Sequence, residues 1–438
     1  MPPIDPRLII VFVWIVGVSL VAFVILWRGR HPATQRRLPL PSLPLLLLLT
    51  FLLRLAPALI LPRGARYEMS VFRQAGDLTL AGQSVYLNRV AHPYLPFQLY
   101  WYAAAVWLTN NAGIFFEFWV KLLNIAAEVG LTALIFQAVR HNRGESAARY
   151  AALFYAFNPV TIMVSSYQGQ FDAVPLLFLL LAWYILTYQP ARRGALLTAA
   201  LALGVAILSK TWPVLLAPIL FLRLPRWGRR IRFTLFVALI PLAGIWLYEA
   251  RFPGSLMPML RRAARAGSIP GWWGYSAVLN VLATFTGRGG LLYAFLNQVG
   301  KWVALALASV SIWWTRSRQP LYAFMLAVLI LFACVPNLGV QGLSWIVPLA
   351  VILGCWNELG WYAVGATLYM WIAYWGIHLS DGLMLLLPKP TAHATIQLAS
   401  LLVWVPIVLW LWQEVAGRGR MPALFRPHLR PQAQEDAP

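Results

Sequence analysis

The chain has 438 residues, of which 61% are hydrophobic and only 11% are charged. Soluble domains carry about 25% charged residues, so this composition excludes an ordinary soluble protein and indicates that lipid is the solvent. The net charge of +22 does not indicate a nucleic-acid partner, because the Lys and Arg residues separate the apolar runs and do not gather in one domain.

Apolar segments of membrane-spanning length follow one another along the chain. About 20 apolar residues are enough to cross a bilayer as a helix. The first segment is too long for a signal-peptide core and has no small-residue cleavage site before Arg28, so we expect it to be retained. We expect about 13 spans, at residues 8–27, 38–61, 116–139, 147–164, 173–188, 195–208, 214–224, 233–248, 291–314, 321–335, 344–355, 362–379 and 393–412.

Basic residues in the connections predict the orientation of these spans. Cytoplasmic connections are rich in Lys and Arg, which predicts an outer N-terminus and a cytoplasmic C-terminus. The short aromatic piece at 96–108 would place Arg140, Arg143 and Arg149 outside if it spanned, so we expect an interfacial helix there. The sequence thus predicts an integral, multi-pass membrane protein with one transmembrane domain, 1–416, and a disordered cytoplasmic tail, 417–438.

Two long extracytoplasmic loops are expected, at residues 62–115 and 249–290. The first contains Glu68 and Asp77, two of only 13 acidic residues in the chain. A scarce carboxylate between apolar segments is a candidate for chemistry, and we favour Glu68 over Asp77, which we expect to be solvated or structural. The second loop carries the basic run from Arg261 to Arg265, which could bind a phosphate or lie on anionic headgroups.

Two further groups fall inside or beside predicted spans. Glu128 lies in the middle of a span, where an ionisable group must face the protein interior, and we expect it to contact Asn124 one helical turn earlier. Cys334 and Cys355 sit in or near apolar runs, so we expect them to pack as small hydrophobic side chains.

Several motifs in collinear order resemble those of the GT-C glycosyltransferases. The closest similarity is to the mannosyltransferase of GPI-anchor assembly and to actinobacterial mannosyltransferases that use polyprenyl-phosphate mannose. Each motif alone is weak, and the order carries the resemblance. The motifs are E-M-S-V-F (68–72), L-A-G-Q-S-V-Y (80–86), H-P-Y-L-P (92–96), F-W-V-K-L-L-N (118–124), N-P (158–159), G-Q-F-D (169–172), S-K-T-W-P (209–213) and P-N-L-G-V-Q-G-L-S-W-I-V-P (336–348).

The resemblance implies an all-α GT-C-like bundle and assigns the catalytic acid to Glu68, where related enzymes mostly have Asp. Arg66 stands where the GPI-type enzymes carry a second acid, so neither a metal nor another cofactor is expected. Transfer from a lipid-phosphate sugar needs a base for the acceptor hydroxyl and cations for the departing phosphate. The candidate cations for the donor phosphate are Lys210, Arg261, Arg262, Arg265 and His92.

The same motifs supply candidates for substrate binding, namely Tyr94, Gln170, Asp172, Gln341 and Trp345. Alternatives remain open for several of these side chains. Asp172 could cap a helix, since Asp favours helix N-termini, and Lys210 could extend its ammonium to the membrane surface. Trp272, Trp273 and Trp345 could stack on sugar rings or lie in the aromatic belt of the membrane interface.

The function predicted from the sequence is that of an inverting, membrane-integral glycosyltransferase. It would transfer a sugar, with mannose expected, from a polyprenyl-phosphate donor to a lipid, glycan or protein acceptor at the extracytoplasmic face. The alternative is a polytopic transporter or lipid flippase. Transporters place their ionisable groups near the bilayer midplane, whereas most carboxylates outside the tail fall at the outer side here, which favours an interfacial enzyme.

Overall fold

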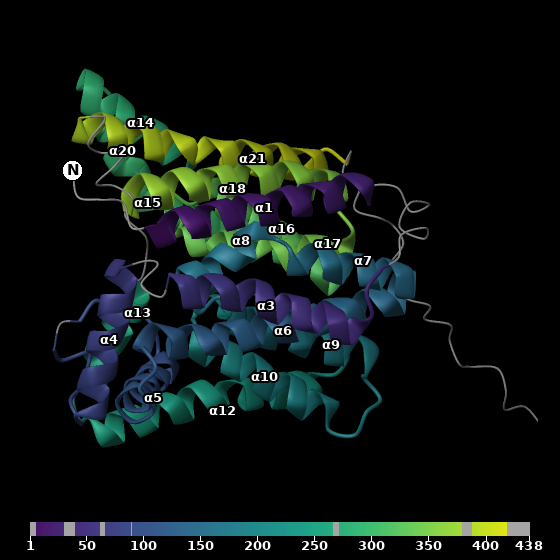
Figure 1. Ribbon diagram of the computed structural model, residues 1–438. Coiled ribbons are helices and arrows are strands. Elements are labelled where there is room, and N and C mark those ends of the chain that lie inside the picture. Colours follow the sequence, from purple (N-terminus) through teal and green to yellow (C-terminus); the bar gives the residue numbers. More distant parts are fainter. Residues whose placement is uncertain are drawn as a thin grey trace, which may run out of the picture.

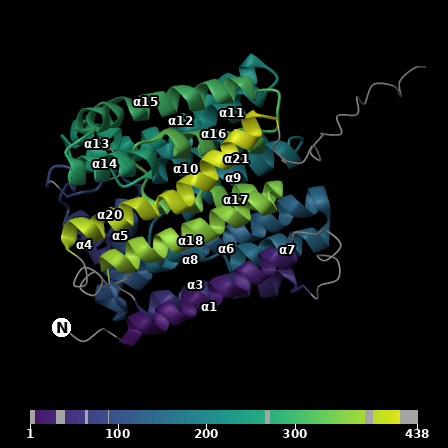
Figure 2. The ribbon, with the colours of Figure 1, turned by 90° about the horizontal axis from the view of Figure 1, so that it is seen from above.

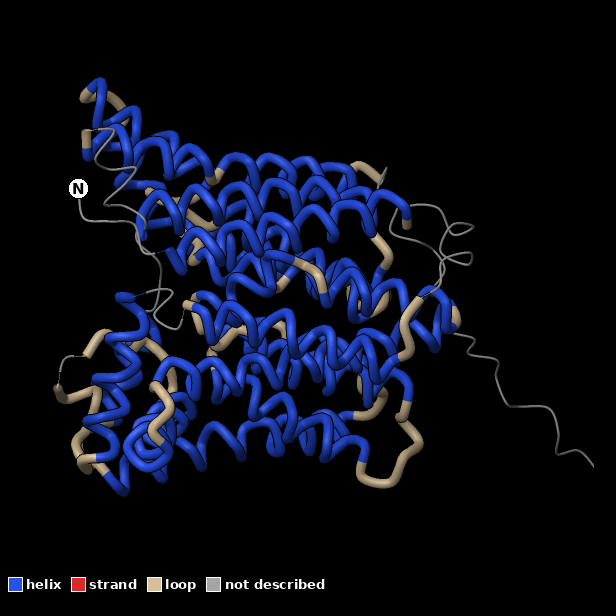
Figure 3. Tube along the Cα trace, in the orientation of Figure 1, coloured by secondary structure: helices blue, strands red, loops and turns tan. Residues whose placement is uncertain are grey.

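The computed structural model describes residues 6–29, 40–61, 66–88, 90–265, 271–378 and 388–417. Within these ranges every regular element is helical (Figure 3), which confirms the predicted all-α polytopic architecture. The tail predicted to be disordered lies outside the described residues from position 418 onward.

The helices of the N-terminal half are α1 (Pro6–Arg28), α3 (Leu43–Ile60), α4 (Arg66–Leu80), α5 (Phe97–Ala112), α6 (Phe116–Arg143), α7 (Glu145–Ala156), α8 (Pro159–Ile162), the π-turn η1 (Met163–Tyr167), α9 (Ala173–Tyr188), α10 (Ala195–Ser209), the 3₁₀ turn η2 (Trp212–Leu215) and α11 (Ala217–Arg223). Those of the C-terminal half are α12 (Trp227–Arg251), α13 (Leu256–Arg265), α14 (Gly274–Thr286), α15 (Gly290–Trp314), α16 (Pro320–Cys334), the 3₁₀ turn η3 (Val340–Ser344), α17 (Ile346–Leu353), α18 (Trp356–His378), α20 (Lys389–Ala399) and α21 (Leu401–Val415).

Each of the 13 predicted spans coincides with a helix or with consecutive helices. In the described part of the chain, six helical segments are long and apolar enough to cross a membrane alone: α1, α3, α6, α12, α15 and the joined α20–α21. Shorter apolar helices cover most of the other predicted spans. The predicted loop 249–290 is not extended, because α13 and α14 occupy most of it.

The long helices run roughly side by side, and three helices gather at one end of the bundle. Figure 1 shows α4 and α13 at that end, with α5 seen almost along its axis, and Figure 2 places all three at the same end. The junction of α6 and α7, with Arg140 and Arg143, lies at the opposite end. The segment predicted as an interfacial helix therefore runs across the spans.

Close packing fixes α4 on α5. The rings of Phe72 and Tyr102 stack with their centres 4.7 Å apart. Gly76 faces the backbone of α5 so closely that an added Cβ would lie 2.6 Å from the carbonyl oxygen of Tyr102. Because no side chain stands between the two backbones here, α4 is held at a set distance from α5, and Glu68 in its first turn is positioned with it.

A buried cation stabilises a helix break between α7 and α8. Asn158 and Pro159 end one helix and begin the next, which frees carbonyl groups inside the bundle. Arg54 donates to the carbonyl of Ala156 (3.0 Å), to the hydroxyl of Thr161 (2.8 Å) and to Glu128 (2.9 Å). Freed backbone groups at membrane depth need such partners, so this cluster allows the interrupted span.

The predicted contact between Glu128 and Asn124 is wrong. Glu128 pairs with Arg54 on α3, and Asn124 donates its amide to the carbonyl of Gly169 at 3.1 Å. A sequence shows that a mid-span carboxylate needs a partner but does not show which distant helix provides it. Cys334 and Cys355 are free thiols, and both pack against the hydrophobic core as expected.

Gly169 makes the turn that leads from η1 into α9. Its φ is +69°, and an added Cβ would lie 2.6 Å from the Cε of Met69 and 3.1 Å from the Cγ of Lys121. Met69 follows Glu68 on α4, so the turn packs against the residue next to the catalytic candidate.

We predict that Gly169→Ala destabilises the protein and lowers its activity. A left-handed backbone costs roughly 1–2 kcal/mol for a residue with a Cβ, and the new methyl group must also displace Met69. Gly113→Ala is the matched control, because its φ is +70° and nothing lies within 4 Å of the added Cβ. Both variants should unfold at lower temperature, whereas only Gly169→Ala should lose turnover; equal turnover in the two variants would contradict the prediction.

Candidate active site

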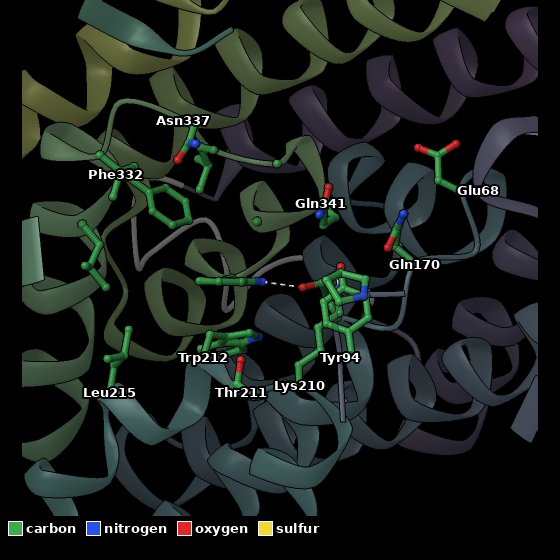
Figure 4. Close-up of a pocket in the computed structure, with 18 of the residues that line it drawn as sticks. Glu68, Tyr94, Gln170, Lys210, Thr211, Trp212, Leu215, Phe332, Asn337 and Gln341 are labelled. Carbon is green, nitrogen blue, oxygen red and sulfur yellow. Dashed lines mark hydrogen bonds and ion pairs between the residues drawn. The ribbon is translucent and has the colours of Figure 1, made fainter. Parts of the chain in front are cut away.

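A cavity of about 620 Å³ opens at the end of the bundle where α4 lies. Figure 4 shows Glu68 and Gln170 on one side of it and Trp212, Leu215 and Phe332 on the other. The first side is polar and the other is largely apolar. The lining residues are Tyr67, Glu68, Val71, Phe72, Ala91, Pro93, Tyr94, Gln170, Asp172, Lys210, Thr211, Trp212, Leu215, Lys301, Leu305, Leu331, Phe332, Val335, Asn337, Leu338, Gly339, Gln341, Gly342 and Trp345.

Glu68 lies in the cavity wall, as a carboxylate that acts on a bound substrate must. In the described part of the chain, its Oε2 is buried and has no hydrogen-bond partner. Burial raises the pKa of the Glu68 carboxyl above its ordinary value, although its own backbone N–H opposes this shift. A carboxylate with a raised pKa accepts a proton more readily at neutral pH, which suits a general base.

Asp172 and Lys210 form a buried ion pair beside the cavity. The Nζ of Lys210 donates to Oδ2 of Asp172 at 2.6 Å, and the indole Nε1 of Trp345 donates to Oδ1 at 2.8 Å. The same ammonium lies 4.7 Å from the centre of the Tyr94 ring. Burial alone would lower the pKa of Lys210, but Asp172 and Tyr94 outweigh it, so that pKa is raised and the lysine stays charged.

This pair resolves two alternatives that the sequence left open. Asp172 precedes α9 but its side chain makes no capping hydrogen bond, so the helix-cap interpretation is wrong. Lys210 is 3% exposed and its ammonium points to Asp172, so it does not reach for the membrane surface. The positive charge predicted to bind a donor phosphate is neutralised by a carboxylate predicted to bind substrate.

Aromatic and amide side chains complete the cavity. The rings of Trp212 and Trp345 stack with their centres 4.0 Å apart. Gln170 is 6% exposed, and in the described part of the chain its Oε1 has no hydrogen-bond partner. Gln341 lies between Gln170 and Trp212 in the view of Figure 4. Stacked rings and unsatisfied amides are groups that could hold a sugar ring and its hydroxyls.

Arg262, on α13, binds the loop that follows α4 and does not line the cavity. Its guanidinium donates to the carbonyls of Val85, Tyr86 and Val90, and it lies over the Tyr86 ring. Arg261 is exposed and does not line the cavity, and the side chain of Arg265 lies outside the described residues. The structure therefore does not bring Arg261 or Arg262 into the site as predicted.

His92 lies buried behind the cavity, among the rings of Tyr86, Tyr94 and Tyr102. Burial lowers its pKa to about 3, so the imidazole is neutral at physiological pH. The structure does not support the prediction that His92 supplies positive charge to a phosphate.

Some of the remaining aromatic and acidic candidates line the cavity, and others lie outside it. Trp273 is fully buried and donates its Nε1 to the carbonyl of Phe332, and neither it nor Trp272 lines the cavity. Asp77 is exposed on α4, with Arg73 at 4.0 Å. Of the three tryptophans considered for sugar stacking, only Trp345 is in the cavity.

Sequence reasoning missed Trp212, Asn337 and Lys301, which all line the cavity. Trp212 and Asn337 lie inside recognised motifs, S-K-T-W-P and P-N-L-G, so their motif membership was a usable signal. Lys301 lies outside every motif. Its signal was a lone cation in an otherwise apolar span.

The sequence predicts that the protein uses no metal, and this remains a prediction. Within the described ranges, no group of three His, Cys, Asp or Glu side chains is placed to hold a metal ion.

Comparison with known proteins supports the class of protein predicted from the motifs. Residues 92–248 match the family model described as dolichyl-phosphate-mannose-protein mannosyltransferase. The matched region contains Tyr94, Gln170, Asp172 and Lys210, whereas Glu68 precedes it. No curated protein matches the chain.

Among solved structures, the crystal structure of ArnT from Cupriavidus metallidurans bound to undecaprenyl phosphate is similar, with 17% identity over 74% of this chain and 68% of that chain. Its TM-score is 0.34, so the family match carries the assignment. This match confirms the resemblance predicted from the motifs, which is to membrane-integral glycosyltransferases of the GT-C superfamily. This assignment sets aside the alternative of a transporter or flippase.

We predict that Asp172→Asn destabilises the protein, because it leaves a buried, unpaired lysine while keeping an acceptor for Trp345. Breaking a buried pair on one side typically costs about 3–5 kcal/mol. The double variant Asp172→Asn with Lys210→Met removes both charges and should recover most of that loss, as measured by denaturant unfolding in detergent. A double variant no more stable than the single one would contradict this account.

Proposed function

We propose that this glycosyltransferase transfers mannose from a polyprenyl-phosphate donor to an acceptor hydroxyl at the extracytoplasmic face, with inversion at the anomeric carbon. The matching family of dolichyl-phosphate-mannose-protein mannosyltransferases supports this donor class and sugar. The form of the cavity supports it as well. Its polar side could hold a sugar, and its apolar side, with Leu215, Leu305 and Leu331, could hold the first isoprenoid units.

One observation carries the proposal, namely a single unpartnered carboxylate oxygen of Glu68 in the wall of this cavity. In the proposed step, the acceptor oxygen attacks the anomeric carbon while the bond from that carbon to the phosphate oxygen breaks. The hydroxyl proton passes to Glu68, and polyprenyl phosphate leaves with the bonding electrons. A single displacement of this kind inverts the configuration, and one carboxylate serves as its general base.

Several other cavity residues have supporting roles in this proposal. The Asp172–Lys210 pair and Trp345 hold the cavity wall, and Trp345 with Trp212 offers a stacking surface for the sugar. Gln170 and Gln341 offer amides to its hydroxyls, and Tyr94 lies over the lysine. We propose that no metal takes part, so chelation should leave turnover unchanged. The acceptor is a lipid, a glycan or a protein that presents a hydroxyl to the Glu68 side.

We predict that Glu68→Gln lowers kcat by about 10²–10⁴-fold, the usual contribution of a general base. The amide keeps the size of the side chain, so folding and donor KM should change little. Glu68→Asp should lose about 100-fold, because the shorter side chain retracts the carboxylate by about 1 Å.

The pH profile tests the same group. Only the deprotonated carboxylate acts as a base, so wild-type activity should fall as the pH drops through the raised pKa of Glu68. The acidic limb should therefore lie above the ordinary value of about 4.3. Asp77→Asn is the matched control, since Asp77 is an exposed carboxyl on the same helix. The base assignment fails if folded Glu68→Gln keeps more than about a tenth of wild-type kcat.

The proposed side of the membrane has its own test. In a variant with Cys334 and Cys355 replaced by Ser, we predict that Ser146→Cys is not labelled from outside intact cells by an impermeant maleimide. The Arg-rich end of α6 should be cytoplasmic. Gln83→Cys, in the exposed turn that follows α4, is the control and should be labelled. Labelling of position 146 but not of position 83 would place the cavity on the cytoplasmic side.

A further inference from the structure

Lys301 is the one charged residue in the sequence of α15, which is 25 residues long and apolar enough to span a membrane. Counting about 1.5 Å per residue from Trp314 at the far end, Lys301 lies roughly 20 Å along the helix. A cation within a span is costly, and such residues usually face a polar cavity and mark a functional path. Membrane insertion does not explain why this apolar span contains a lysine.

The structure places Lys301 at the cavity, one turn before Leu305, which lines it too. Its Nζ donates to the carbonyl of Ala264, near the end of α13, at 3.3 Å. In the described ranges no carboxylate lies within 4 Å of this ammonium, since the ion pairs found there involve other residues. Within the described ranges, Lys301 therefore lines the cavity as a cation that no carboxylate neutralises.

The other candidate cations whose side chains the structure describes either have partners or lie outside the cavity. Lys210 forms an ion pair with Asp172, and the guanidinium of Arg262 donates to three backbone carbonyls. Arg261 is exposed and lies outside the lining. Among the described lining residues, Lys301 is thus the cation left to meet an anion.

We propose that Lys301 binds the phosphate of the lipid-linked donor and of the polyprenyl phosphate that leaves. This inference rests on the proposed function and names a phosphate ligand for it. Lys301 lines the same cavity as Leu305 and Leu331, the apolar residues that would contact the isoprenoid chain. Negative charge grows on the phosphate as its bond to the sugar breaks, so a cation there stabilises the transition state.

A purely structural role for Lys301 makes a different prediction. A lysine that only reaches toward the interface and caps α13 would affect stability and would not distinguish a phosphate from an alcohol. A phosphate ligand would discriminate between two lipids that differ in that group alone. Undecaprenyl phosphate and undecaprenol are such a pair.

The experiment measures binding of both lipids to the purified full chain by native mass spectrometry. We expect wild-type protein to bind undecaprenyl phosphate more tightly than undecaprenol. Lys301→Gln and Lys301→Met should weaken binding of the phosphate about 10–100-fold, as expected for loss of a hydrogen bond to a charged group, and leave binding of undecaprenol unchanged. Lys301→Arg should retain most of the affinity. Arg261→Gln is the matched control, since it removes one positive charge outside the cavity, and it should bind like wild type.

The outcomes distinguish a failure of the Lys301 inference from a failure of the proposed function. If the neutral variants keep the wild-type preference for the phosphate, the role of Lys301 is overturned while the proposed function stands. Equal loss of both lipids, or a similar loss in Arg261→Gln, also overturns it, because the effect would then be structural or due to net charge. If wild-type protein shows no preference for the phosphate, the proposed donor class fails and the Lys301 inference fails with it.

Discussion

The buried ion pair of Asp172 and Lys210 is the interaction on which the candidate site depends. Asp172 stands at the start of α9, Lys210 directly follows α10, and Trp345 adds a hydrogen bond from the turn before α17. A buried pair adds little net stability, but its geometry is demanding, since either partner alone is a costly unpaired charge. Three segments distant in sequence must therefore meet at one point. That meeting also sets Trp345 against Trp212 and so shapes the cavity.

A second buried cluster makes this meeting possible from within the bundle. The span that delivers Asp172 is broken at Asn158 and again around Gly169, and a broken helix in lipid exposes polar backbone groups. Arg54 satisfies the carbonyls at the first break, and Asn124 donates to the carbonyl of Gly169 at the second. The G-Q-F-D turn can enter the cavity because other helices supply these donors.

Hydropathy and charge predicted the helices and their order, because lipid forces every span to satisfy its own backbone. They also placed Glu68 in the first extracytoplasmic loop, and the structure finds it in the cavity wall. What they could not predict was which charges pair. Glu128 and its partner Arg54 are 74 residues apart. The positive charge of Arg262 does not indicate which backbone carbonyls it binds. Lys301 was overlooked because one lysine barely lowers the hydropathy of a long span.

The pairing pattern divides the charges of the site by their capacity to act on a substrate. A charge already held by a buried partner changes its interactions little when a substrate arrives, so Asp172, Lys210 and Arg262 mainly fix positions. An unpaired group destabilises the empty protein, and it gains a partner only when substrate or transition state is present. In the described part of the chain, Glu68 has an oxygen without a hydrogen-bond partner and Lys301 has no carboxylate partner, and both lie in the wall of the same cavity. That is the arrangement a sugar transfer from a phosphate requires, with a base for the incoming hydroxyl and a positive charge for the departing phosphate.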